Sequence, residues 1–292
     1  MWSALLKTMR PRQWTKNVFV FAALVFDHKL FVLNYVLVTV AGFALLCLLS
    51  SAVYIINDLA DIEKDRRHPK KRHRPLPSGR LGPGVAVAAV ALLLAFSLPS
   101  AFWLNMWFGV VAVAYLGINL LYSFWLKNIV LVDVLILASG FLLRAAGGAV
   151  LVESAISPWL YICLSLLALF LGFGKRRGEI LLMNGNDGDT RQVLRDYSLP
   201  FIDELINLVA TATLVAYSLY TFSAENLPRN HAMMLTIPFV LYGVLRYLYL
   251  IHIKGEGGAP DELVLTDRPL QLAFGLWALT AILILYLHRP PE

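Results

Sequence analysis

Apolar runs about 20 residues long recur from one end of this chain to the other, and they constrain its fold more than any other feature. A helix of about 20 apolar residues crosses the hydrocarbon core of a bilayer. Only 15% of the residues are charged, against roughly 25% in soluble domains, so a water-facing globule could not be covered. The sequence therefore predicts an all-α, polytopic membrane protein. About nine spans are expected: Pro11–Phe26, Asn34–Leu59, Gly84–Trp103, Asn105–Trp125, Ile129–Val152, Pro158–Gly174, Pro200–Phe222, His231–His252 and Pro269–His288.

The polar stretches between the spans are too short to form a separate soluble domain, so residues 1–292 are expected to form one transmembrane catalytic domain. The longest polar stretches are Ala60–Pro83, Lys175–Leu199 and Ile253–Arg268. The basic N-terminus lacks the small-residue cleavage site of a signal peptide. Cys47 and Cys163 lie in apolar runs and are interpreted as small core residues.

The basic residues predict the orientation of the chain. With the N-terminus inside, 20 of the 25 Lys and Arg residues fall on the inner side and three on the outer side. This asymmetry fits the positive-inside rule in one orientation only, which predicts a cytoplasmic N-terminus in the plasma (inner) membrane. The net charge of +6 then reflects topology first, so it does not point to nucleic acid as a partner.

The acidic residues are not explained by topology. Of the 19 Asp and Glu residues, 15 fall on the same inner side as the basic ones. Both signs of charge at one membrane face are what a site for Mg²⁺ and phosphate requires. A transporter would instead place its binding groups near the middle of the bilayer, so an anion transporter is the less favoured class.

The second span ends in three regularly spaced aspartates. Asp58, Asp61 and Asp65 follow Asn57 at offsets that place them on one stripe of a helix. Three carboxylates this close repel one another unless a cation lies among them, and hard oxygen ligands suit Mg²⁺. The alternative is a solvated helix end in which Asp65 pairs with neighbouring Arg and Lys side chains.

A basic run, Arg66 to Arg74, follows the aspartates directly. Such a run usually reflects topology and anionic lipid headgroups. Its position beside the acids makes Arg74, and after it Arg72, candidates to bind a diphosphate.

The next inner turn carries Tyr122 and Lys127, with Asp133 at the start of the following span. Lys127 could simply extend its amine to the interface, and Asp133 could favour the positive end of its helix. Together they offer a donor and an acceptor to the same site. Arg144 lies deeper in that span among glycines, which indicate close helix packing.

A third inner cluster closes the sixth span with Lys175, Arg176, Arg177 and Glu179. By itself it could be a plain stop-transfer signal. Asp187 and Asp189 follow, and a solvated turn is favoured over a metal loop there.

The spaced motif Asn57-Asp58-x-x-Asp61-x-x-x-Asp65, followed by Arg72-x-Arg74-Pro-Leu-Pro-Ser-Gly79, resembles the UbiA-type intramembrane prenyltransferase superfamily. The likeness covers nearly the whole chain. It implies a helical bundle that binds a Mg²⁺-diphosphate and draws in a lipid chain.

One departure from the superfamily pattern is informative. Prenyl-transferring members carry a second aspartate motif where this chain has Lys175-Arg176-Arg177-Gly178-Glu179. That feature, the opening Arg10–Asn17 and the segment Tyr122–Lys127 look like the decaprenyl-phosphate phosphoribosyltransferase branch. The resemblance implies that phosphoribosyl diphosphate donates 5-phosphoribose to a polyprenyl phosphate, for arabinose-type lipid donors of the cell envelope.

The charges favour the same branch. A phosphoribosyl donor and a lipid phosphate together bring a diphosphate and two monoesters, and only the diphosphate needs the metal site. We expect Asp58, Asp61 and Asp65 to hold Mg²⁺ with Asn57 in support, and Lys16, Lys127 and the Lys175–Arg177 cluster to bind the other phosphates. A prenyltransferase acting on an aromatic or glycerol-phosphate acceptor is the alternative. A homo-oligomer is compatible with the sequence.

Overall fold

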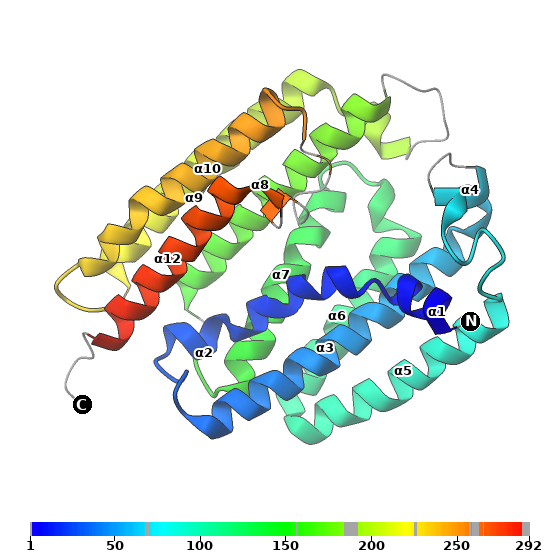
Figure 1. The fold of residues 1–292 in the computed structure, drawn as a ribbon, viewed down its shortest axis with the longest axis horizontal. Coiled ribbons are helices and arrows are strands. Elements are labelled where there is room, and N and C mark those ends of the chain that lie inside the picture. The colour runs from blue at the N-terminus through cyan, green and yellow to red at the C-terminus, as the bar shows by residue number, and fades with distance from the viewer. Residues whose placement is uncertain are drawn as a thin grey trace. The chain divides into compact units, whose positions relative to one another are not determined.

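The computed structural model describes residues 2–67, 71–155, 157–183, 192–224, 227–256, 258, 263–264 and 266–287. Within these ranges every regular element is a helix, as predicted (Figure 1). The chain forms two compact units: the first holds α1, η1 and α3 to α7, the second holds α8, α9, α10 and α12, and α2 and η4 contribute residues to both. The prediction of a single domain stays a prediction.

The helices of the described residues are, in chain order, α1 (Trp2–Met9), η1 (Pro11–Phe21), α2 (Ala22–Phe26), α3 (Leu33–Ala60), α4 (Ile62–Arg67), η2 (Lys71–His73), α5 (Pro83–Leu104), α6 (Met106–Phe124), η3 (Leu126–Asn128), α7 (Val132–Leu151), α8 (Pro158–Met183), η4 (Gln192–Asp196), α9 (Leu199–Ser223), η5 (Ala232–Thr236), α10 (Ile237–His252) and α12 (Arg268–Leu287).

Eight helical segments of the described chain are long and apolar enough to cross a membrane: α3, α5, α6, α7, α8, α9, α10 together with η5, and α12. The prediction of a polytopic helical membrane protein is therefore confirmed, with one span fewer than expected. The sixth span is longer than predicted, because α8 runs to Met183 and includes the basic cluster that the sequence suggested would begin a loop.

The first predicted span is not a continuous α-helix. Residues Pro11–Phe26 form the 11-residue 3₁₀ helix η1 followed by the short α-helix α2. Arg10, whose φ of 54° lies in the left-handed region, separates η1 from α1. Pro11 lacks a backbone N–H and cannot continue α1. A 3₁₀ helix this long is uncommon, and here it is held to α3 by polar contacts three residues apart. The indole N–H of Trp14 donates to Ser51 Oγ at 3.0 Å, and Asn17 Nδ2 lies 3.2 Å from Cys47 Sγ.

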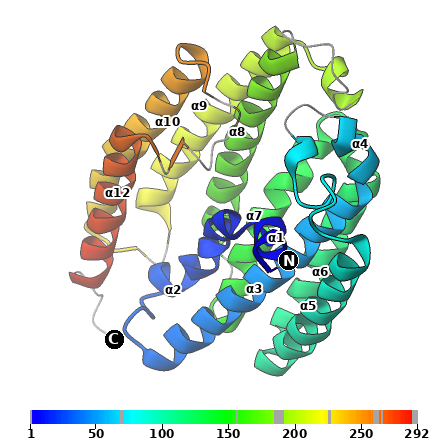
Figure 2. The same cartoon turned by 45° about the vertical axis from the view of Figure 1, so that its right-hand side comes forward.

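In the first unit, α3 packs against α1, η1, α5, α6 and α7 (Figures 1 and 2). Two glycines of α7 make its close contacts possible. A Cβ on Gly148 would lie 1.8 Å from the carbonyl oxygen of Val20, and one on Gly147 would lie 3.2 Å from the Phe108 ring. The sequence interpretation of these glycines as packing sites agrees with this geometry, and the packing fixes η1 against α7.

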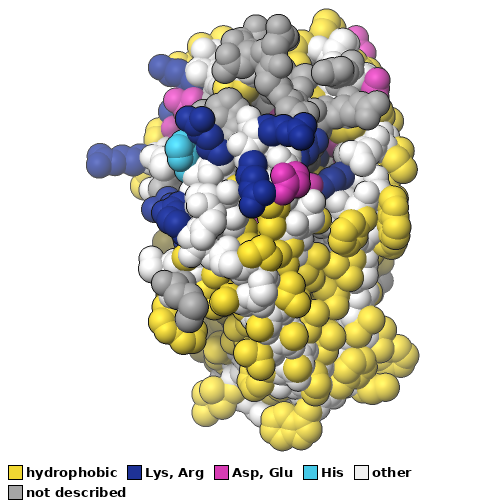
Figure 3. Space-filling view, turned by 90° about the vertical axis from the view of Figure 1, so that its right-hand side faces the viewer, with side chains coloured by type: hydrophobic (Ala, Val, Ile, Leu, Met, Phe, Trp, Pro, Cys, Tyr) yellow, Lys and Arg dark blue, Asp and Glu magenta, His cyan; other side chains and the backbone are white. Residues whose placement is uncertain are grey.

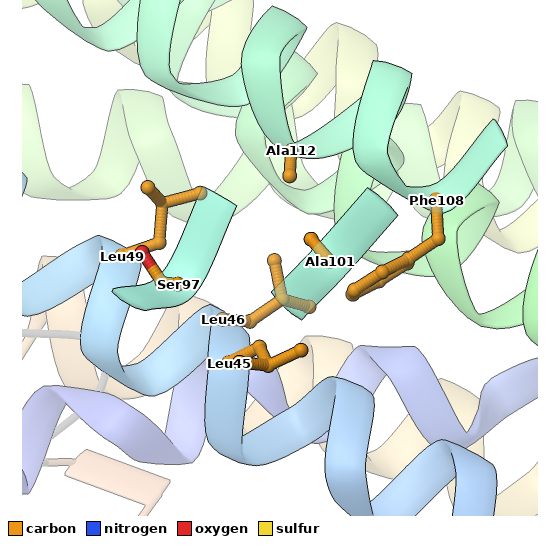
Figure 4. Close-up of a pocket in the computed structure, with 7 residues that line it drawn as sticks. All are labelled: Leu45, Leu46, Leu49, Ser97, Ala101, Phe108 and Ala112. Atoms are coloured by element: carbon orange, nitrogen blue, oxygen red, sulfur yellow. The ribbon is translucent and has the colours of Figure 1, made fainter. Parts of the chain in front are cut away.

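A small apolar cavity lies between α3, α5 and α6 (Figure 4). Ser97 is its one polar lining residue, and its hydroxyl has no hydrogen-bond partner within the described residues. No charged side chain lines this cavity, so we do not consider it a candidate for phosphate chemistry. Its lining consists of Leu45, Leu46, Leu49, Ser97, Ala101, Phe108 and Ala112.

In the second unit, α8 packs against α9 and α10 packs against α12. Aromatic side chains dominate the core at one end of this unit: the Tyr217 hydroxyl accepts from the Trp277 indole at 2.7 Å and bonds Thr236 Oγ1 at 2.6 Å. Arg246, expected inside a span, pairs with Asp267 just before α12, with Nη2 to Oδ2 at 2.7 Å. Arg246 therefore lies within a span, as expected, and an acid at the start of α12 neutralises its charge.

Candidate active site

Figure 3 shows Lys, Arg, Asp and Glu side chains gathered at one end of the molecule's face, with hydrophobic side chains covering the flank below. Three carboxylates of the first unit lie at the junction of α3 and α4. Asp61 caps α3 with φ −100° and ψ 11°, and the chain turns there into the short helix α4. The three aspartates therefore do not form the continuous helical stripe that their spacing predicted. Asp58 and Asp65 are both 1% exposed, and Asp61 is only half-buried.

Two buried carboxylates are joined by one guanidinium. Arg74 Nη1 donates to Asp65 Oδ2 at 2.7 Å and to Asp58 Oδ1 at 3.2 Å. Arg10 Nη2 reaches the same Asp58 oxygen at 2.5 Å, and Lys71 Nζ lies 3.7 Å from Asp65 Oδ1. A buried carboxylate must be paired to remain ionised, and here each one faces two cations.

Asp61 faces a different cation. Lys127 Nζ donates to its two carboxylate oxygens at 2.9 and 3.1 Å. Lys127 lies in η3, between α6 and α7, so a residue 66 positions along the chain completes the site. We call Asp58, Asp61 and Asp65 together with their cations the first charge cluster; the cations are Arg10, Lys71, Arg74 and Lys127.

A strained turn links Lys127 to α7. Leu131 has φ 66° and ψ −42°, and the N–H of Val132 donates to the carbonyl of Val130 at 2.8 Å. This is a γ-turn that a leucine rarely adopts. The turn places Asp133 in the first turn of α7, where the side chain is fully buried. A buried acid at a helix N-terminus is favoured by the helix dipole, which is the structural alternative that the sequence left open.

Arg144 ties the broken first segment to α6 and α7. Its Nε donates to Asn17 Oδ1 at 2.6 Å, Nη1 to the carbonyl of Gly140 at 2.6 Å, and Nη2 to the Tyr115 hydroxyl at 2.8 Å. The guanidinium also lies over the Tyr115 ring, 4.8 Å from its centroid. No carboxylate pairs with it in the part of the chain that the structure describes, so its charge is offset by dipoles and rings. It holds η1, and through η1 the site residue Arg10.

The basic cluster of the second unit is built differently. Arg176 is fully buried and pairs with Glu179, one helical turn away, at 2.5 Å. Arg177 Nε donates to Asp203 Oδ1 at 2.7 Å, and its Nη1 donates to the carbonyl of Ile251 at 2.7 Å. His252 Nε2 lies 3.3 Å from the same Asp203 oxygen. We call Arg176, Arg177, Glu179, Asp203 and His252 the second charge cluster; it ties α8 to α9 and α10.

The structure gathers some of the predicted site residues and leaves others apart. Arg74 and Lys127, which the sequence predicted to bind phosphates, contact the aspartates. The pairing of Asp65 with Arg74 matches the alternative that the sequence left open. Arg72 contacts His73, with Nε 3.3 Å from Nε2. Arg10 was missed as a site residue; its place in the family-like opening segment was the available signal. Asn57, Lys16, Tyr122 and Lys175 are half-buried, the first at the end of α3 and the others on η1, α6 and α8. Asp187 and Asp189 lie outside the described residues.

The donors of the first charge cluster fit Mg²⁺ in type, because carboxylate oxygens are the ligands that this ion takes from proteins. They do not form a ready metal site. No group of three Asp, Glu, His or Cys residues is placed to share one ion in the described ranges. Each carboxylate that could serve as a ligand is bound to Arg or Lys instead.

A sequence profile of the UbiA prenyltransferase family matches residues 17–257. The chain belongs to the UbiA prenyltransferase family. This family membership makes the chain a membrane-embedded transferase and confirms the resemblance inferred from the aspartate motif. A UbiA homolog from Archaeoglobus fulgidus bound to GPP and Mg²⁺ has a TM-score of 0.72 at 18% identity, covering 97% of this chain and 99% of that chain. At this identity the likeness establishes the fold alone.

Curated relatives in the UbiA family place the chain within a branch. The decaprenyl-phosphate phosphoribosyltransferase of Mycolicibacterium smegmatis is 34% identical over 294 residues, which cover 94% of this chain and 90% of the relative. The enzyme of the same name from Corynebacterium glutamicum is 32% identical over 292 residues, which cover 97% and 87%.

Proposed function

We propose that the chain transfers 5-phosphoribose from phosphoribosyl diphosphate to a polyprenyl phosphate of the decaprenyl type and releases diphosphate. The full-length similarity to decaprenyl-phosphate phosphoribosyltransferases supports this donor and this acceptor. The observation that carries the proposal is the charge pattern of the sequence at its two motifs: one aspartate cluster, and a basic cluster where prenyl-transferring UbiA members have acids.

Asp58, Asp61 and Asp65 are the residues that would hold Mg²⁺ on the donor diphosphate, with Asn57 supporting them. Bound there, the ion would neutralise the charge that builds on the leaving diphosphate. The metal-bound structures of UbiA relatives support a divalent ion in this family.

The chain's own cations supply the remaining stabilisation. Arg10, Arg74 and Lys127 contact the aspartates, so they would lie beside a diphosphate held by those acids. Preorganised cations stabilise a transition state in which negative charge moves onto the leaving group. The acceptor phosphate is ionised at neutral pH and needs no general base, so no His is assigned a proton-transfer role. In-line attack predicts inversion at the anomeric carbon.

The remaining predicted binding residues would serve the donor 5-phosphate and the lipid phosphate. Lys16, Tyr122 and the Lys175–Arg177 segment are the candidates, and the carboxylate of Asp133 would instead bind ribose hydroxyls or the metal ion. Because Arg176 is bound to Glu179, and Arg177 to Asp203 and the Ile251 carbonyl, Lys175 is the better candidate of that segment for direct contact with a phosphate.

The asymmetry of basic residues supports an active site that faces the cytoplasm from the plasma membrane. A ribosylated polyprenyl phosphate formed there would serve as a precursor of arabinose-type lipid donors for the cell envelope.

The test is to incubate membranes containing the chain with radiolabelled phosphoribosyl diphosphate and decaprenyl phosphate, and to count label in the organic extract. We expect a labelled lipid that depends on the acceptor and on Mg²⁺. EDTA and Asp61→Asn should each abolish it, and normal turnover of Asp61→Asn would contradict the metal role. Transfer of a labelled prenyl diphosphate to an aromatic acceptor, with no ribosylated lipid, would establish the alternative prenyltransferase reading.

A further inference from the structure

The cations of the first charge cluster hold the atoms that a metal ion would need. Lys127 bonds both oxygens of Asp61, and Arg74 bridges Asp58 and Asp65. Mg²⁺ binds oxygens at about 2.0–2.1 Å in near-octahedral geometry. Only Asp61 has both oxygens bonded to a cation, whereas Asp58 is held through Oδ1 and Asp65 through Oδ2. For an ion to use Asp61, or the Asp58 and Asp65 oxygens that Arg74 bridges, those bonds to Lys127 and Arg74 must open.

The same cations are the groups that a diphosphate would need. Guanidinium and ammonium groups form strong charge-assisted hydrogen bonds with phosphate oxygens. The cationic partners of Asp58 and Asp65 are more exposed than the carboxylates they hold: the Arg10 side chain is 25% exposed and that of Arg74 is 31%, against 2% for Asp58. They can therefore turn toward an entering anion while the acids stay in place.

The ion pairs of the cluster oppose binding of either ligand alone. Four cations face three carboxylates, so the cluster carries one net positive charge. A divalent ion alone would add two positive charges beside ammonium and guanidinium groups. A diphosphate alone would have to compete with the carboxylates for their cations. When both ligands bind, their opposite charges largely cancel, so the net charge of the cluster stays close to zero.

We propose that Lys127, Arg74 and Arg10 exchange partners, leaving the aspartates for the diphosphate as the metal ion takes their place. Metal and diphosphate then bind cooperatively, and each binds poorly without the other. Such coupling is reciprocal and is commonly worth about 5- to 150-fold in affinity. This inference rests on the proposed function, because it uses the same metal and the same diphosphate.

The exchange makes an unusual prediction for two variants of one ion pair. Removing the cation in Lys127→Met frees Asp61, so Mn²⁺ without diphosphate should bind about tenfold more tightly than to the wild type. Removing the acid in Asp61→Asn frees Lys127, so inorganic pyrophosphate in EDTA should bind about tenfold more tightly. Each variant should weaken joint binding of Mn²⁺ and pyrophosphate.

The measurements use the full chain purified in detergent. Mn²⁺ binding is followed by electron paramagnetic resonance, and radiolabelled pyrophosphate binding by equilibrium dialysis with Mn²⁺ or with EDTA. Arg66→Met and Glu63→Gln are matched controls, because these residues form an exposed ion pair on α4 at 2.6 Å and are not bonded to the three aspartates. Each control should change affinity less than about threefold, as expected for an exposed pair.

The outcomes separate this inference from the proposed function. Unchanged or weaker Mn²⁺ binding by Lys127→Met, with transfer activity still dependent on metal, would overturn the exchange and leave the proposed function standing. Transfer that survives EDTA would overturn the proposed metal role itself. If Lys127→Met does not elute as a folded species, Lys127→Gln provides the same test, and Lys127→Arg should retain wild-type coupling.

Discussion

The two charge clusters place opposite charges in the interior. In the first, the aspartates that Arg10 and Arg74 bind are buried and the cations are partly exposed. In the second, Arg176 is fully buried, whereas the Asp203 side chain is 32% exposed. A buried acid bordered by partly exposed cations can accept a metal ion and a phosphate, whereas a buried arginine bonded within its helix serves packing.

Both clusters join residues that lie far apart in the sequence, but only the second pairs its most buried charge within one helix. Lys127 and Asp61 are 66 residues apart, and Arg10 and Asp58 are 48 apart. Arg177 lies 26 residues from Asp203 and 74 from Ile251, whereas the fully buried Arg176 pairs with Glu179, three residues along the same helix. The first cluster therefore forms only when η1, α3 and η3 are all packed, which suits a site whose activity depends on the complete unit.

The largest expected difference between the clusters is in catalysis. Asp58→Asn should lower the rate of ribosylated lipid formation by about 10²- to 10³-fold, because an amide no longer offers the charge that holds the metal ion. Asp203→Asn should change that rate by less than about threefold, as for a partly exposed pair that does not contact the first cluster. The labelled-lipid assay measures both, and an equal loss in the two variants would contradict the distinction.

The next largest effect concerns the packing of η1 against α7, which helps to position the first charge cluster. Gly148→Ala would push a methyl group into the backbone of η1, since a Cβ there lies 1.8 Å from the Val20 carbonyl oxygen. We expect a loss of about 2–4 kcal/mol in unfolding free energy. Gly117→Ala is the matched control, because nothing lies within 4 Å of a Cβ at that position. Denaturation in mild detergent compares the two, and equal stability would show that η1 shifts without cost.

A smaller effect is expected from the second cluster. Arg177→Met removes the bonds to Asp203 and to the Ile251 carbonyl. With Asp203 partly exposed, solvent screens the loss, so we expect about 1–3 kcal/mol of destabilisation. The specific activity of the folded fraction should stay within about threefold of wild type, as for a residue whose effect is on stability. A selective rise in KM for the donor would instead assign Arg177 to substrate binding.

The smallest effect concerns an ion pair outside both clusters. The hydrogen bond from Arg246 lowers the pKa of Asp267, with a further bond from the Leu270 N–H. A lowered pKa in the folded state means that the stabilisation is complete above the ordinary carboxyl pKa of about 3.9 and is lost as the pH falls through the folded value. The melting temperature of the wild type should therefore fall more than that of Asp267→Asn between pH 5 and the lowest accessible pH. Parallel curves would contradict the role of this pair.

The apolar runs predicted most of the fold because a membrane span has one dominant requirement, an uninterrupted apolar length. They did not predict the break at Arg10 or the 3₁₀ form of η1. Those depend on Pro11 and on partners in α3 such as Ser51 and Cys47, which no local pattern reveals.

The acidic residues of the candidate site could be predicted from the sequence, whereas the cations that pair with them could be predicted only in part. The spacing of Asp58, Asp61 and Asp65 predicted an acidic site. The closeness of Arg74 to them in the sequence predicted that it belongs to that site. Arg10 could not be assigned from its surroundings, because its contact with Asp58 exists only once η1 packs along α3. The sequence assigned Arg177 to phosphate binding. Its actual partners, Asp203 and the Ile251 carbonyl, come from other helices and could not be recognised from the sequence around Arg177.

Because η1 is a 3₁₀ helix, its side chains can be spaced along the helix axis to match those of α3. Three residues of a 3₁₀ helix and four of an α-helix both advance about 6 Å. The two contacts, Trp14 with Ser51 and Asn17 with Cys47, are three residues apart on η1 and four residues apart on α3. A single-residue insertion between Trp14 and Asn17 would break this match, so a length change there would have to add three residues to η1 and four to α3 to keep both contacts.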